Sequence, residues 1–427
     1  MPKLVPKSKI ARCLFFLGLV AIFFGVATGG LFWQMNQAIY SEGFKFGRSA
    51  EWPYLYPAPS DKQAEYDKEL AEVLDRYPDL KPQWRSVADK ENGFLELFNL
   101  FEYIIGADGV EMEHGVALSN ELRQELSGVL TEEEFGDGKR FSGVIKELDR
   151  IAELKERSCA GVDPYRLFFH PPEAVKNFTK VLLYDARLAA NEGDKERALS
   201  RVRTAVRIGE HFSQVETVSL NAVVVSTLLE KVVLETTFND LFPRLELTEG
   251  DYRKWREVIS SGHVNFGSKN ISIGDFNIIF PVLSAPICES VWLFKLSGVD
   301  NTYDAMAECH LELMKLSAGG YRDCLDTKSL EVGLWDKVEK TPYFSRRLVR
   351  VLYVGIPAHI KTVTRASARF RYYDAALAQL GGEELPLELI TETPFIFDSE
   401  KKVLTMPDDP ILEQFEFEPI ELSFGTN

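Results

Sequence analysis

Residues 171–212 read PPEAVKNFTKVLLYDARLAANEGDKERALSRVRTAVRIGEHF, a stretch that predicts two antiparallel helices joined by a tight turn. In the first helix, apolar side chains recur at helical spacing: Val175, Phe178, Leu182, Ala186 and Ala189. The N-E-G-D sequence of residues 191–194 is typical of a turn. The second helix carries a stripe of small or short side chains: Ala198, Val202, Ala205 and Gly209. Such a stripe lets two helices approach closely, so the stretch predicts a packed helical hairpin.

This hairpin resembles one unit of a tetratricopeptide repeat, because GDKERAL places Ala198 and Ala205 seven residues apart. The resemblance covers about 34 of the 427 residues. Asp185 stands where the repeat usually has an apolar residue, and a partial echo, EGDYRKW at 249–255, falls at the wrong interval. A generic helical hairpin and a degenerate repeat are both compatible with these residues, and either one implies packing or partner binding.

Helical periodicity extends over most of residues 61–380, so the predicted fold class is mainly α. Further helices are predicted at Asp61–Arg76, Phe94–Ile105, Leu118–Leu130, Phe141–Arg157 and Ser219–Leu234, with an acidic turn at Glu132–Gly138. The apolar stretch Phe276–Leu296 contains two prolines and charged residues, so we interpret it as a buried helix pair and not as a membrane crossing.

The N-terminal run CLFFLGLVAIFFGVATGGLFW, residues 13–33, holds 21 residues without a charge. At about 1.5 Å per residue it spans roughly 30 Å, the thickness of a bilayer core, so it predicts a single transmembrane helix. Residues 1–12 carry four basic side chains and no acidic one, which predicts a cytoplasmic N-terminus with the bulk of the chain outside. The alternative is a cleaved signal peptide, although the run is long for one. Residues 34–60, rich in proline and aromatics, are interpreted as a linker.

The chain has a net charge of −16, and beyond the four N-terminal bases 45 Lys and Arg face 65 Asp and Glu, a balance of −20. Such an excess repels phosphates, which argues against a nucleic-acid partner. Against this background, residues 342–373 contain no acidic side chain and seven basic ones: Arg346, Arg347, Arg350, Lys361, Arg365, Arg369 and Arg371. Three of them recur every four residues and share one helix face. Two interpretations stay open: acidic helices of the same chain face this segment, or it binds an anionic envelope polymer, a lipid headgroup or an acidic protein.

The sequence predicts no cofactor and no metal site, because it has no C-x-x-C or H-E-x-x-H pattern, Gly-rich phosphate loop or G-x-S-x-G motif. The six histidines are scattered, and we interpret His310, Glu308 and Glu312 as polar side chains on the protein surface. The four cysteines beyond the membrane run allow two disulfides in an oxidising compartment, and Cys309 with Cys324 is the easiest pair to close. Buried free thiols are the alternative. Catalytic residues stay unknown.

The C-terminal residues 381–427 lose helical periodicity, and five prolines recur in them. Short strands are predicted at Phe395–Phe397, Lys402–Thr405 and Phe415–Phe417. Three features of the chain occur in this order: the N-terminal anchor, a helical middle with ARLAANEGDKERAL, and an end that reads ARFRYYDAALAQLGGEELPLELI and then TPFIFDSEKKVL. In these features the chain is similar to uncharacterised membrane-anchored helical proteins of planctomycete and verrucomicrobial bacteria. The match is loose, since Thr393 stands where those tails have Asp, and it implies no known activity.

These features together predict a noncatalytic, single-pass scaffold or binding protein of the bacterial inner membrane, with its bulk in the periplasm. Its predicted partners are the membrane, through residues 13–33, and a protein or an anionic envelope component. The alternative is a hydrolase acting on envelope material, with acidic residues in a cleft between helices. That alternative requires a pocket that gathers two carboxylates, or a histidine with a carboxylate.

Overall fold

The computed structural model describes residues 63–105, 119–127, 130–162, 172–217, 220–261, 300–316 and 356–424, together with isolated positions between 273 and 350. The helices are α2 (Gln63–Arg76), α3 (Gly93–Ile105), α4 (Asn120–Ser127), α5 (Glu132–Phe135), α6 (Ser142–Ala152), α8 (Pro172–Asn191), α9 (Lys195–Ser213), α10 (Leu220–Thr236), α11 (Glu249–Ser261), α15 (Asp300–Leu316), α19 (Ile356–Leu380) and α20 (Pro410–Glu413). Short 3-10 turns lie at Pro78–Leu80, Asp89–Glu91, Lys139–Phe141 and Phe242–Arg244, and a π-helical turn at Thr237–Leu241 follows α10. The predicted mainly helical class is confirmed.

The predicted hairpin is present as α8 and α9, and both helices agree with the prediction to within two residues. The turn between them contains Gly193, whose positive φ of 75° suits a residue without a Cβ. Asp194 then caps α9, because its side chain accepts a hydrogen bond from the N–H of Arg197 at 3.0 Å. Local turn and cap chemistry therefore fixes the antiparallel arrangement.

Asp185 of α8, the departure from the repeat pattern, is buried and binds two arginines of α9. Its carboxylate accepts hydrogen bonds from Arg197 and from the Nε of Arg201, the latter at 2.6 Å. Arg201 also reaches Asp149 of α6 at 2.6 Å. An apolar residue at position 185 would leave these arginines without a buried acceptor, so the polar seam explains why the hairpin departs from the repeat.

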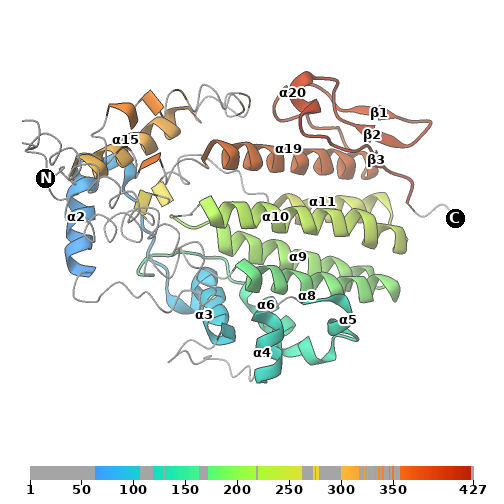
Figure 1. Cartoon of the computed structure of the whole chain (residues 1–427). Coiled ribbons are helices and arrows are strands. Elements are labelled where there is room, and N and C mark those ends of the chain that lie inside the picture. Colours follow the sequence, from blue (N-terminus) through green and yellow to red (C-terminus); the bar gives the residue numbers. More distant parts are fainter. Residues whose placement is uncertain are drawn as a thin grey trace, which may run out of the picture.

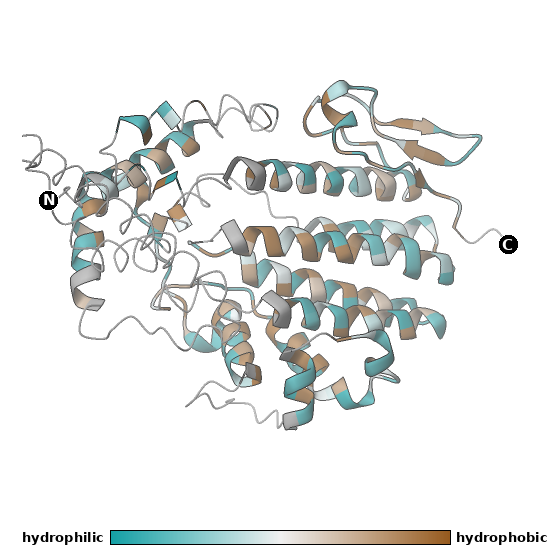
Figure 2. Ribbon diagram, in the orientation of Figure 1, coloured by the Kyte–Doolittle hydropathy of each residue, from teal (hydrophilic) through white to brown (hydrophobic). Residues whose placement is uncertain are grey.

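The long helices stack in layers (Figure 1). Helix α8 packs on α9, α9 on α10 and α11, and these two on α19, while α3, α4 and α6 cover the other side of the hairpin. Figure 2 shows polar and apolar residues interspersed along α8, α9 and α19, as expected of helices buried on one face. Large side chains fill the interior: Phe101 stacks on Phe178 with ring centroids 5.0 Å apart, and Phe242 meets Trp255 edge to face at 5.2 Å.

A small antiparallel sheet closes the C-terminal tail, in the order β1 (Ile396–Asp398), β2 (Val403–Thr405), β3 (Ile420–Glu421). It packs on α19, where the hydroxyl of Tyr372 donates to the carbonyl of Leu404 at 2.6 Å and accepts from the N–H of Ile420 at 3.2 Å. The first two predicted strands are confirmed. The prediction at Phe415–Phe417 is wrong, because both aromatic rings pack beside α19 and the third strand begins at Ile420.

Two local predictions need correction. The helix predicted at Phe141–Arg157 ends at Ala152, and the acidic turn at Glu132–Gly138 begins with the short helix α5. A capping box stabilises α5, since Thr131 accepts from the N–H of Glu134 while the Glu134 carboxylate accepts from the N–H of Thr131. Acidic side chains in the first turn are stabilised by the positive end of the helix dipole, so this run of acidic residues forms a helix and not a turn.

Among the described residues, none of the helices combines the length and apolar character needed to cross a membrane. The predicted span at residues 13–33, the flanking segments 1–12 and 34–60, and most of 276–296 lie outside the described residues. The membrane predictions therefore stay predictions.

Candidate binding surface on helix α19

The structure separates the seven predicted basic residues into two groups. In the first group, Arg346 and Arg350 both pair with Glu339, and the Arg346 Nη1 lies 2.6 Å from a Glu339 carboxylate oxygen. The Arg350 guanidinium also lies 5.5 Å from the ring centroid of Trp335. Arg347 lies outside the described residues. Internal ion pairing thus accounts for the two described arginines before α19.

Arg371 also has an acidic neighbour within the chain. Its guanidinium lies 3.6 Å from Asp374, one turn along α19. Asp374 is buried and makes a shorter contact of 2.8 Å with Arg256 of α11. The hydrogen bond to Asp374 is the main reason why the pKa of Arg256 is raised above its ordinary value. Asp374 therefore ties α19 to α11, and Arg371 contributes at its edge.

The second group is Lys361, Arg365 and Arg369, which recur one turn apart on α19; we call it the α19 basic stripe. All three are half-buried, and no carboxylate of the described chain lies within ion-pair distance of them. Arg365 donates instead to the carbonyl of Phe415, and the Arg369 guanidinium lies 5.9 Å from the ring centroid of Phe417. Arg365 and Arg369 are therefore held in place by neutral groups of the C-terminal tail.

Electrostatics around the stripe leave it positive. The pKa of Arg369 is lowered by burial and by the neighbouring charge of Arg365, and the more distant Glu235 and Glu230 of α10 only partly oppose this. Arginine stays protonated in proteins, so Arg369 keeps its positive charge despite the lowered pKa. An added carboxylate or phosphate at this position would be favourable.

Next to the stripe, α10 exposes apolar side chains. Leu228 and Val232 are 54% and 38% exposed, and they share the outer face of α10 with Glu235, whose charge acts on Arg369. Half-buried cations beside exposed aliphatic groups are suited to a partner that is acidic and apolar at once. This combination could not be predicted from the sequence, because α10 and α19 are more than 100 residues apart.

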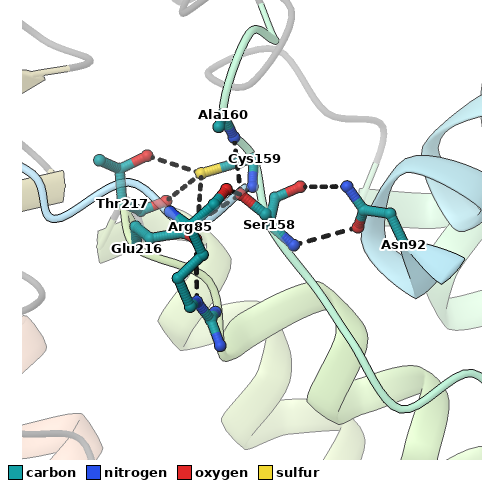
Figure 3. Close-up of polar contacts among 7 residues, drawn as sticks. All are labelled: Arg85, Asn92, Ser158, Cys159, Ala160, Glu216 and Thr217. Atoms are coloured by element: carbon teal, nitrogen blue, oxygen red, sulfur yellow. Dashed lines mark hydrogen bonds and ion pairs between the residues drawn. The ribbon is translucent and has the colours of Figure 1, made fainter. Parts of the chain in front are cut away.

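A second polar cluster, missed by sequence reasoning, joins three loops around Cys159 (Figure 3). The Glu216 carboxylate accepts from the N–H of Cys159 at 3.1 Å and from the Nε of Arg85 at 2.9 Å. Asn92 and Ser158 exchange two hydrogen bonds, of 2.8 and 3.0 Å. Burial acts to raise the pKa of Glu216, but the hydrogen bonds that its carboxylate accepts hold the pKa below its ordinary value: they come from the backbone N–H groups of Glu216 and Cys159, then from Ser158 and Arg85. The cluster fixes the connection between α9 and α10.

The thiol of Cys159 is free and buried, and its Sγ lies 3.0 Å from the Thr217 hydroxyl. Burial raises its pKa to about 11, so at neutral pH it is a thiol and a poor nucleophile. Cys309 is buried in α15, whereas Cys324 and Cys288 lie outside the described residues, so the predicted disulfide stays a prediction.

The surface interpretation of His310 is wrong. Its side chain is fully buried and meets the ring of Phe276 edge to face at 5.5 Å, and burial lowers its pKa to about 3. Glu308 next to it in sequence is exposed, because residues two apart on a helix point in different directions. Throughout the part of the chain that the structure describes, no three His, Cys, Asp or Glu side chains gather to hold a metal ion.

Comparisons with known proteins found no match to this chain among family models, curated proteins or solved structures.

Proposed function

We propose that the chain is a noncatalytic helical binding protein of the bacterial envelope, and that the α19 basic stripe binds an acidic partner protein. The observation that carries the proposal is the lack of ion pairs to Lys361, Arg365 and Arg369 among the described residues. In a chain of net charge −16, most internal arginines find acids, as Arg197, Arg201 and Arg256 do. Three aligned cations without them favour an acidic group from another molecule.

An acidic protein fits this surface better than an anionic lipid does. The acidic excess of the whole chain repels an anionic membrane surface at long range, whereas one acidic helix can contact the stripe locally. The exposed Leu228 and Val232 supply apolar area that a protein side chain can cover. Removing one charge of a half-buried pair at such an interface weakens binding by about 1.4 kcal/mol, or tenfold.

The proposed place of action is the outer face of the inner membrane, with residues 13–33 as the anchor. Support comes from the 21 uncharged residues of that run and the four bases before it. The hydrolase alternative gains no support: the cavity found between α9, α10 and α11 contains a single carboxylate, Glu230. Paired acids would be needed for that chemistry.

The test is crosslinking in intact cells followed by capture of the full-length chain from carbonate-washed membranes. We expect a stoichiometric partner from the wild type, and loss of it with Lys361→Glu and with Arg365→Glu/Arg369→Glu. Lys361→Glu is the cleaner variant, because both arginines also contact the tail. Lys139→Glu, with a side chain 86% exposed on a remote turn, is the matched control for the charge change.

Circular dichroism of each variant shows whether the helices are retained. A partner that persists after protease treatment of the captured material is not a protein and contradicts the proposal. So does equal recovery with Lys361→Glu and Lys139→Glu. Absence of the chain from the washed membranes contradicts the anchor alone and leaves the stripe testable in the soluble fraction.

A further inference from the structure

Helices α9, α10 and α11 line a partly open cavity that the proposed function does not use. Its volume is about 40 Å³. The lining residues that decide its character are Gly209 and Ser213 of α9, Ser226, Leu229 and Glu230 of α10, and Ile259 of α11. Since one water needs roughly 10–15 Å³ on this measure, the space suits about three water-sized groups.

The hollow exists because α9 has a small residue there. A Cβ added at Gly209 would meet no atom within 4 Å, so close packing does not require glycine at this position. This differs from the predicted role of the small-residue stripe: Ala198 is buried in the packed interior, but Gly209 leaves open space beside Ala205, which also lines the cavity. Glycine in a helix interior is unfavourable relative to alanine, and no contact within the described residues offsets that cost.

One buried polar atom in the cavity wall indicates that a ligand with a polar atom fits better than a purely apolar one. Ser226 lines the space and is 6% exposed, and its Oγ has no hydrogen-bond partner among the described residues. A buried hydroxyl without a partner is costly, and the cost is relieved when a ligand supplies a donor or acceptor. Ser213, also on the wall, already donates to the carbonyl of Gly209 at 2.7 Å.

We propose that this cavity binds a small aliphatic group bearing one hydroxyl, with its carbon atoms against Leu229 and Ile259 and its oxygen hydrogen-bonded to Ser226. The half-buried Glu230 is one of the lining residues, and its negative charge disfavours an anionic ligand. The group belongs either to a free small alcohol or to a hydroxyl side chain of a partner. The proposal stands independently of the α19 basic stripe.

The probe is 1-propanol, titrated into the full-length chain in lipid nanodiscs and followed by the NMR signals of the Leu229 and Ile259 methyl groups. We expect saturable shifts that propionate, of the same chain length, does not produce. Ser226→Ala should weaken binding about fivefold, the equivalent of one hydrogen bond. Gly209→Leu should fill the space and abolish the shifts.

Gly250→Leu is the matched control, because a Cβ at this glycine of α11 also has room, its nearest neighbour lying 3.8 Å away, and Gly250 does not line the cavity. Shifts that do not saturate, that persist in Gly209→Leu or that propionate reproduces overturn the proposal. An unchanged affinity in Ser226→Ala overturns the role of the hydroxyl. A photocrosslinker at Val206 distinguishes the two possible sources of the hydroxyl group. If it captures a protein and 1-propanol prevents the capture, the group is a side chain of a partner. If no protein is captured, or 1-propanol does not affect the capture, the group is a free alcohol.

Discussion

Two residues of α9, only two positions apart, lie in opposite kinds of surroundings. His211 faces α3 and α6, where it is fully buried and donates from Nε2 to the carbonyl of Ile151 at 3.0 Å. A Cβ at Gly93 would lie 2.5 Å from His211 Nδ1, so glycine is required there for the backbone of α3 to approach the ring. Gly209 faces α10, where a Cβ would touch nothing.

The contrast shows that the same helix is closed on one side and open on the other. On the closed side, glycine permits contact, and nearby charges are compensated, since Arg157 and Arg207 both pair with Glu210. On the open side, glycine leaves space beside a hydroxyl that lacks a partner among the described residues. The Nδ1 of His211 on the closed side also lacks one, but there the Gly93 backbone lies against the ring. We infer that the α3, α6 and α9 contact is mainly structural, whereas the α9 and α10 contact leaves room for binding.

Acid should destabilise the closed side through His211. Burial, and then the charge of Arg157, lower its pKa from 6.5 to about 4, so the folded state holds the ring neutral. As the pH falls below 6.5 the unfolded chain takes up the proton first, and the stability present above that pH is lost as the pH approaches 4. The free energy of unfolding should fall by about 3 kcal/mol from this group.

The measurement is chemical unfolding of the wild type and of His211→Gln between pH 7 and pH 4. Glutamine keeps an N–H for the carbonyl of Ile151 but does not titrate. The difference in unfolding free energy between the two proteins should shrink as the pH falls, because only the wild type loses this contribution. Parallel pH profiles would show that His211 is accessible to protons in the folded state.

Gly93→Ala tests the steric half of the same contact. The added methyl overlaps the imidazole, which is fixed between α6 and α9, so we expect a destabilisation of about 2 kcal/mol at neutral pH. A double-mutant cycle with His211→Ala checks the cause, since removal of the ring should make the second substitution nearly neutral. An additive result would place the strain elsewhere in the α3 backbone.

Local sequence signals were enough to predict the α8 and α9 hairpin but not the contacts around it. The turn at 191–194 and the apolar periodicity predicted α8 and α9 correctly, because both signals act over a few residues. The hydrogen bond of Cys159 to Glu216 joins positions 57 residues apart, and that of Ser158 to Arg85 joins positions 73 apart. No periodicity encodes such pairs, since tertiary packing alone brings them together.

The candidate binding surface was only partly predicted, because spacing along the sequence shows which residues share a helix face but not which helices pack together. Spacing of four residues correctly placed Lys361, Arg365 and Arg369 on one face of a helix. The prediction grouped Arg346 and Arg350 with them because the basic segment was taken to begin at 342, which left out Glu339, the acid that pairs with both. The apolar part of the surface, on α10, depends on which helix packs beside α19.

Gly209→Ala gives the smallest expected effect and has the opposite sign. Alanine favours a helix interior by about 1 kcal/mol over glycine, and the new methyl enters open space, so the variant should be stabilised by about that amount. Thermal or chemical unfolding checks this, with Gly93→Ala as the counterpart on the closed side. Both changes add one methyl group to a glycine, but Gly93 is the first residue of α3 and Gly209 lies within α9, so the helix-propensity gain is larger at Gly209. A destabilised Gly93→Ala beside a stabilised Gly209→Ala still indicates different packing at the two sites. A destabilised Gly209→Ala would mean that the open side of α9 is closed in solution, which would remove the basis for a ligand between α9 and α10.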